Sequence, residues 1–263
     1  MEGDRLPMGL YYKLMRGSLR LTFPHAKTIF EAEPDGDPAV FVSNHAAITG
    51  PVMMTLDFPR AHRAWAVANA MDPEMAKNYA FHDVLLGRSR KHQGFYRFLS
   101  GIIARMLPPL LTGSDTIPVF HDKNIVSTFK QSVKTLVEGK DLVIFAEAPA
   151  RFSTYVNELQ PGFVDVARLY YRKTKKRLKF YPVYLNKKLA VISVGAPIAY
   201  DPDRSLDEQR QTIAAYLRDN IDRLARQLPA HTPMPFMSDR WYGAYSEFEY
   251  DAPGYWRMIT EGK

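Results

Sequence analysis

The chain has 263 residues, of which 46% are hydrophobic and 24% charged, and its 35 Lys and Arg against 28 Asp and Glu give a net charge of +7. These values are typical of one large globular domain or two small ones, and they exclude wholesale disorder, a collagen helix and a continuous coiled coil. Because the chain contains no Cys, a disulfide framework, a thiol nucleophile and a Cys-ligated metal centre are also excluded, while the basic charge favours an anionic partner.

The first 30 residues are expected to form a helical segment of their own. Residues 8–23 mix Leu, Tyr, Met and Phe with Lys13, Arg16 and Arg20, which predicts a short amphipathic helix. Such a helix either packs on the core of the domain or lies in a lipid interface. No secretory signal is expected, and the longest stretch without charged residues, 38–56, is too polar for a transmembrane span.

Strand and helix patterns alternate along residues 31–230. Strands are predicted at residues 39–43, 141–147, 178–185 and 188–198. Helices are predicted after Pro51, at residues 124–139 and at residues 206–228, the last with a capping box from Ser205 to Glu208. The alternation predicts a single α/β domain with a mixed central sheet flanked by helices, followed by an aromatic-rich extension at residues 231–263.

Two further segments bear on membrane contact. Residues 172–179 hold six basic residues in eight positions, which indicates either a patch for anionic headgroups or CoA phosphates, or a solvated helix end. The C-terminal extension carries five acidic residues against three basic ones. We therefore expect this extension to pack on the domain and not on an anionic membrane.

Two groups of polar residues follow predicted strands and are candidates for chemistry. Ser43-Asn44-His45 comes directly after the first strand, where His45 could act as a general base or be a structural histidine. Glu147 ends the second strand and is followed by Arg151. This pair could bind a phosphate or position a hydroxyl, or form a local ion pair. Catalytic groups in α/β folds tend to lie at such strand ends.

The order of the motifs resembles the glycerolipid acyltransferase superfamily, which includes the glycerol-3-phosphate and lysophosphatidate acyltransferases. Asn44 and His45 match the first two residues of its Asn-His-x-x-x-x-Asp motif. GSDTIPVFHD resembles its second motif, with His121 where an Arg is expected, and FAEAPAR resembles Phe-Pro-Glu-Gly-Thr-Arg, with Glu147 matched and Arg151 one place late. Gly162 in LQPGFVDVA, together with the later FYPVYL and VGAPI, resembles the family's remaining segments, so the likeness spans about residues 8–228.

The resemblance implies an O-acyltransferase of phospholipid metabolism. It would move a fatty acyl group from acyl-CoA or acyl-carrier protein to a hydroxyl, or an amine, of a lysophospholipid or related lipid. His45 and Glu147 would be the catalytic residues, and Asn44, His121, Arg151 and Gly162 would bind substrate, with Asn44 also supporting the loop. The family's chemistry needs no metal and no cofactor besides the acyl donor, and it implies a cytoplasmic enzyme peripherally bound to the membrane.

The chain departs from the family's first motif at Gly50, which stands where the family has the Asp that orients the catalytic His. Losing such an orienting carboxylate lowers the rate by orders of magnitude without removing all catalysis. Either another acid, such as Glu147, approaches His45, or His45 works alone or with a backbone carbonyl, or the protein binds lipid without turning it over. His121 and Ala150 in place of arginines further predict an altered acceptor.

Two other classes of function have little support. A nucleic-acid-binding protein would be supported only by the net charge, since no zinc spacing, recognition helix or aromatic RNA-binding motif accompanies the basic residues. A serine hydrolase would need a Gly-x-Ser-x-Gly turn, which the sequence lacks.

Overall fold

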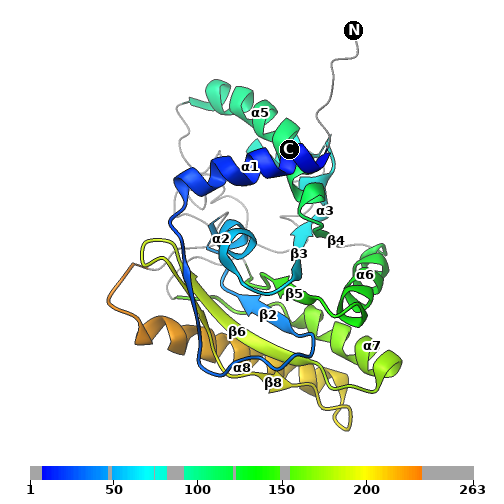
Figure 1. Cartoon of the computed structure of the whole chain (residues 1–263). Helices are drawn as coiled ribbons and strands as arrows, with labels where there is room; N and C mark the ends of the chain where they lie inside the picture. The colour runs from blue at the N-terminus through cyan, green and yellow to red at the C-terminus, as the bar shows by residue number, and fades with distance from the viewer. Residues whose placement is uncertain are drawn as a thin grey trace.

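A mixed β-sheet forms the centre of the computed structural model, which describes residues 8–46, 49–73, 75–81, 92–120, 123–148 and 155–232 (Figure 1). The strands are β1 (Lys27–Phe30), β2 (Val40–Ser43), β3 (His62–Val67), β4 (Ile117–Val119), β5 (Asp141–Ile144), β6 (Lys179–Asn186), β7 (Val191–Val194) and β8 (Ile198–Ala199). The helices are α1 (Met8–Thr22), α2 (Thr49–Asp57), α3 (Ala68–Met71), α4 (Ala76–Tyr79), α5 (Gln93–Gly113), α6 (Ile125–Val137), α7 (Asp165–Thr174) and α8 (Leu206–Gln227), with a 3-10 helix, η4 (Pro161–Val164).

The strand order is β1-β7-β6-β2-β5-β3-β4, with β8 paired to β6. From β6 through β2, β5 and β3 to β4 the neighbouring strands run parallel, whereas β7 and β8 run antiparallel to β6. The predicted fold class, a single α/β domain with a mixed central sheet flanked by helices, is therefore confirmed.

Side chains of the central strands alternate between two apolar layers, as the pleat of a strand requires. On β2, Val40 and Val42 face the layer that contains α6, α7 and α8, whereas Phe41 faces the layer that contains α2. All four residues of β2 and of β5 are buried, which is typical of parallel strands covered on both faces. The middle of the sheet is thus a rigid support for the loops that leave its edge.

The helices predicted from periodicity are present. α8 buries Ile213, Leu217, Ile221 and Leu224, and the Ser205 hydroxyl accepts the Glu208 N–H at 3.2 Å, so the predicted N-cap is confirmed. α6 ends two residues before Gly139, whose φ of +80° lies in the left-handed region that favours glycine. The predicted helix at residues 8–23 is α1, which packs against α5.

The structure differs from the sequence-based elements in several regions, among them α5 and α7, which were not predicted from the sequence, and β5, which ends at Ile144 and not at Glu147. The predicted strand at residues 188–198 is two strands, because the chain turns at Gly195-Ala196-Pro197 between β7 and β8. β1, β3 and β4 were not predicted, and their side chains are only half-buried for the most part, so they lack a clear apolar run.

α1 is tied to the domain at its C-terminal end. Arg20 donates two hydrogen bonds to the Asp57 carboxylate, at 2.7 and 3.2 Å, and the same carboxylate accepts the Ala26 N–H at 3.1 Å. The sequence left open whether this helix packs on the domain or lies in a lipid interface. Its C-terminal end packs on the domain. Among the helices that the structure describes, none has the length and apolar character needed to cross a bilayer.

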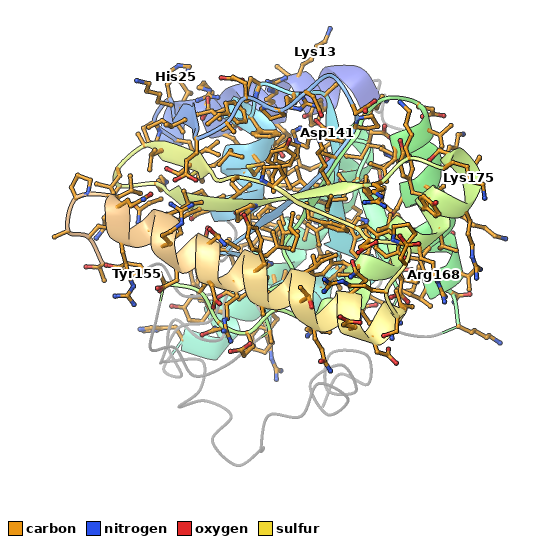
Figure 2. The ribbon with its side chains drawn as sticks, turned by 90° about the horizontal axis from the view of Figure 1, so that it is seen from below. Lys13, His25, Asp141, Tyr155, Arg168 and Lys175 are labelled. Atoms are coloured by element: carbon orange, nitrogen blue, oxygen red, sulfur yellow. The ribbon has the colours of Figure 1, made fainter. Side chains whose placement is uncertain are left out.

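The basic run at residues 172–179 lies around the amino end of β6 and is partly neutralised there. Lys176 and Lys179 form ion pairs with Asp37 and Asp35, and Arg177 lies 3.7 Å from Asp203. Figure 2 shows Lys175 at the far side of the molecule from Tyr155. Since the predicted catalytic residues follow the opposite, carboxyl ends of the parallel strands, this run is remote from them.

Candidate active site

His45 and Glu147 lie together at the carboxyl edge of the sheet. They follow β2 and β5, which are adjacent and parallel, with Val42 opposite Ile144 at the ends of the ladder. The chain after β5 then forms a bridge between Glu147 and Leu159, with Ala148 N–H donating to the Glu158 carbonyl and Gln160 N–H to the Ala146 carbonyl. The two strand ends therefore lie next to each other at this edge, where catalytic groups of α/β folds tend to be found.

The Glu147 carboxylate joins the two loops of this edge. One oxygen accepts the His45 N–H at 2.8 Å and the other accepts the Asn157 N–H at 2.8 Å. The residue is only 5% exposed, and burial raises the pKa of its carboxyl above the usual value, against the lowering effect of the two N–H donors. Of the three alternatives for the missing acid, an approach of Glu147 to His45 is observed at the His45 backbone N–H, and through these bonds Glu147 positions the His45 backbone.

Asn44 fixes the same loop from the opposite side. Its side-chain oxygen accepts the Leu185 N–H at 2.9 Å, and its side-chain nitrogen donates to the Leu185 carbonyl at 3.3 Å. The side chain is 1% exposed and continues the β2–β6 ladder beyond Ser43. These contacts support the loop, the role expected for Asn44, whereas its direct contact with substrate stays a prediction.

The backbone bends sharply between His45 and α2. Ala46 has a φ of +45°, an uncommon conformation for a residue with a side chain, and the Thr49 N–H donates to the Ala46 carbonyl at 3.1 Å. The His45 ring is half-buried, with its centroid 5.4 Å from that of the Phe145 ring. The imidazole is therefore held at the rim of the domain, where a polar substrate group could reach it.

Gly50 packs directly against the bend. A Cβ atom at this position would overlap the His45 carbonyl oxygen and would lie 3.1 Å from the Phe145 ring. Because α2 begins this close to His45, no side chain fits at position 50 without moving the loop. The position at which the first motif has its Asp is therefore occupied in this chain by a glycine that packs against the His45 carbonyl and the Phe145 ring.

The remaining predicted site residues are less constrained. Gly162 lies in η4, directly after the segment that bridges Glu147, and a Cβ there would meet nothing within 4 Å. Its role in binding substrate stays a prediction. His121 and Arg151 lie outside the residues that the structure describes.

Sequence reasoning missed Asn157 and a pair formed by Tyr184 and His231. Asn157 is buried next to Glu147, and within the described ranges its side-chain nitrogen has no hydrogen-bond partner. The Tyr184 hydroxyl lies 2.7 Å from His231 Nε2, and burial raises the pKa of Tyr184 to about 12. Tyr155, two residues before Asn157, contacts His231 in a tilted arrangement, with 5.0 Å between the ring centroids. These residues extend the polar edge beside Glu147, and nothing in their sequence spacing would have indicated them.

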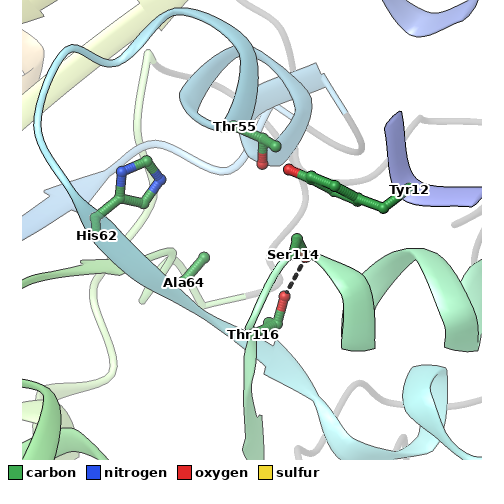
Figure 3. Close-up of a pocket in the computed structure, with 6 residues that line it drawn as sticks. All are labelled: Tyr12, Thr55, His62, Ala64, Ser114 and Thr116. Atoms are coloured by element: carbon green, nitrogen blue, oxygen red, sulfur yellow. Dashed lines mark hydrogen bonds between the residues drawn. The ribbon is translucent and has the colours of Figure 1, made fainter. Parts of the chain in front are cut away.

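A small polar cavity lies elsewhere in the fold (Figure 3). It has a volume of about 90 Å³ and is lined by Tyr12, Thr55, His62, Ala64, Ser114 and Thr116. His62 is the first residue of β3 and lies at the amino edge of the sheet, and burial lowers the pKa of its imidazole. Ligand pockets usually measure about 300–1,000 Å³, so this cavity is too small to hold a fatty acyl chain.

Metal ligands are not grouped in the part of the chain that the structure describes. There, no three His, Asp or Glu side chains lie close enough to hold an ion.

Comparison with known proteins found a likeness among solved structures. No protein-family model matches the chain, and no curated protein matches it. Among solved structures, the chain is similar to the 1-acyl-sn-glycerophosphate (LPA) acyltransferase PlsC from Thermotoga maritima, with 12% sequence identity over 85% of this chain and 80% of that chain, and a TM-score of 0.46.

The packing at Gly50 predicts that even a small side chain is harmful there. We expect Gly50→Ala to lower the free energy of unfolding by about 2 kcal/mol, because the new methyl group overlaps the His45 carbonyl. Gly101→Ala in α5 is the control, since nothing lies within 4 Å of its Cβ position, and it should cause no loss of stability. Urea unfolding measures both, and equal stability of the two variants would contradict the close packing.

The two hydrogen bonds of Glu147 predict a loss of stability in Glu147→Gln. An amide has only one oxygen, so one of the two buried N–H groups loses its acceptor, and we expect a loss of about 2 kcal/mol in urea unfolding. Glu158→Gln changes an exposed carboxylate of the same segment and should shift stability by less than about 0.5 kcal/mol.

The raised pKa of Glu147 also predicts the sign of a pH dependence. The folded state holds this proton more tightly than the unfolded state, so the contribution of Glu147 to stability falls as pH rises above its usual pKa of 4.5. Glu147→Gln should lack this component, and the stability difference between wild type and variant should therefore be larger at about pH 5 than at about pH 8. A difference that grows with pH would show that the carboxyl pKa is lowered instead.

Proposed function

We propose that this protein is an acyltransferase that moves a fatty acyl group from a thioester, on CoA or acyl-carrier protein, to a hydroxyl of a lysophospholipid or related lipid. The observation that carries the proposal is the fixed position of His45 at the carboxyl edge of the sheet. Its backbone is held by Glu147, its neighbour Asn44 is bonded to β6, and Gly50 packs against its carbonyl. The order of sequence motifs supports the same class of reaction.

The proposed mechanism uses His45 as general base. A hydroxyl is a weak nucleophile, so the imidazole accepts its proton while the oxygen attacks the thioester carbonyl carbon. A tetrahedral intermediate forms and then expels the thiolate, which takes the proton back from the imidazolium. The products are an ester and a free thiol, and no further reactant is needed.

Orientation of the base comes from the backbone in this proposal. In His–carboxylate pairs the acid holds the ring directly, and the loss of that acid costs much of the rate. Here the Glu147 carboxylate fixes the loop through the His45 N–H, which limits the positions that the ring can adopt.

A second candidate function is binding of acyl chains or lipids without turnover. The packing of Gly50 favours it, because an orienting acid does not fit at that position. The two candidates differ in whether the wild-type protein releases thiol from an acyl donor.

The test is an acyl-transfer assay with the full chain. Palmitoyl-CoA is offered together with lysophosphatidate, lysophosphatidylcholine, lysophosphatidylglycerol or glycerol 3-phosphate, and thiol release and ester formation are measured. We expect His45→Ala to lower the rate by about 10²–10⁴-fold, the usual contribution of a general base. His25→Ala removes an exposed imidazole and should leave the rate unchanged.

Each outcome of the assay decides between the candidates. Full activity in His45→Ala would contradict the role of the imidazole. If wild type gives no turnover with any donor but binds palmitoyl-CoA, the lipid-binding function is supported instead. A strong preference for glycerol 3-phosphate would contradict the altered acceptor that His121 and Ala150 suggest.

A further inference from the structure

α5 exposes an apolar stripe on the side that faces away from the domain. Phe95, Phe98, Ile102 and Met106 follow one another at spacings of three or four residues and share one face of the helix. Phe95 and Phe98 are 61% and 69% exposed, whereas Ser100 and Ala104 on the opposite face are buried. A row of exposed large apolar side chains of this kind marks an interaction surface in a soluble domain.

The neighbouring helix α1 carries exposed apolar side chains of its own. α1 and α5 pack against each other at the end of the molecule away from α8 (Figure 1). Leu14 and Leu21 are exposed on α1, with Leu21 at 88%, and their spacing of seven residues places them on one face. We call the six residues Leu14, Leu21, Phe95, Phe98, Ile102 and Met106 the α1/α5 apolar surface.

The charges of these two helices have one sign. α1 contains Lys13, Arg16 and Arg20, α5 contains Arg97 and Arg105, and neither helix contains an acidic residue. Arg20 is paired with Asp57. Lys13, Arg16 and Arg105 are exposed, and among the described residues none of the three has a carboxylate partner. Helices that expose both apolar side chains and cations without carboxylate partners are complementary to an anionic lipid surface.

We propose that the α1/α5 apolar surface inserts into the headgroup region of a bilayer that contains anionic phospholipids. Phenylalanine and leucine side chains would enter the acyl boundary, while Lys13, Arg16 and Arg105 contact lipid phosphates. The protein then lies on the membrane through this face and does not span it. The proposal is independent of the acyl-transfer chemistry, because it concerns residues outside the candidate active site.

The test is sedimentation of the full chain with vesicles of phosphatidylcholine, with and without phosphatidylglycerol. We expect binding that requires phosphatidylglycerol and weakens with added salt. Phe95→Ser/Phe98→Ser should weaken binding at least tenfold. The matched control is Val126→Ser/Val137→Ser, which removes two exposed apolar side chains from α6 and should bind as wild type does. Unchanged thermal unfolding midpoints establish that the variants are folded.

A second pair of variants tests the charges. Lys13→Glu/Arg16→Glu/Arg105→Glu should weaken binding at least tenfold. Each cation near an anionic membrane surface contributes a factor of about five to the affinity. Arg172→Glu/Lys173→Glu/Lys175→Glu makes the same number of changes in the basic run at the amino edge of the sheet and should have little effect. If the triple variant in the basic run abolishes binding and the triple variant in α1 and α5 does not, the basic run is the lipid contact and the proposal is wrong.

Other results would also overturn the proposal. Absence of wild-type binding to either vesicle would do so, as would equal binding of wild type and Phe95→Ser/Phe98→Ser. Concentration-dependent self-association that disappears in the same variant would show that the face joins two copies of the chain. Vesicle binding is read without turnover, so its failure leaves the acyl-transfer proposal standing, and inactivity of the wild-type enzyme leaves the vesicle result valid.

Discussion

A single buried carboxylate holds together the loops that form the candidate site. Glu147 has lost most of its hydration, which is unfavourable for a charged group unless hydrogen bonds replace the water. Two backbone N–H groups supply those bonds, one from the loop after β2 and one from the segment that bridges Glu147. Since neither N–H lies in a strand ladder, the carboxylate also satisfies donors that burial would otherwise leave unpaired.

The position of His45 follows from this interaction together with two others. Asn44 carries the β2–β6 pairing one residue further through its side chain, so the chain cannot slide along β6. Gly50 brings the first turn of α2 against the His45 carbonyl. The three constraints act on consecutive parts of the main chain, and together they fix the position of the His45 backbone, from which the imidazole extends. They act on the backbone, whereas the Asp of the motif that the sequence resembles would act on the ring, and Gly50 stands at the position of that Asp.

The predictable parts of the structure are those in which a local pattern decides the outcome. α8 has an N-cap and a continuous apolar stripe, and β2 and β5 are short apolar runs buried on both faces. β1 and β3 have mixed patterns because much of their surface is half-buried, and they become strands only through pairing with distant segments. The carboxyl-edge position of His45 and Glu147 could be predicted, because parallel neighbours end at the same edge. The partners of the Glu147 carboxylate could not, since they are backbone groups that any residue carries.

A local pattern of charge also fails to show which cations are unpaired in the folded protein. The run at residues 172–179 is the densest basic segment of the sequence, yet Lys176 and Lys179 are paired with Asp37 and Asp35, more than a hundred residues away along the chain. The cations of α1 and α5 are sparse in the sequence and unremarkable in number. Because these two helices lack acids and expose apolar side chains, their few charges act together with a hydrophobic surface. The capacity of this basic protein to meet an anionic surface therefore depends both on which cations the fold leaves unpaired and on whether exposed apolar side chains lie on the same helices.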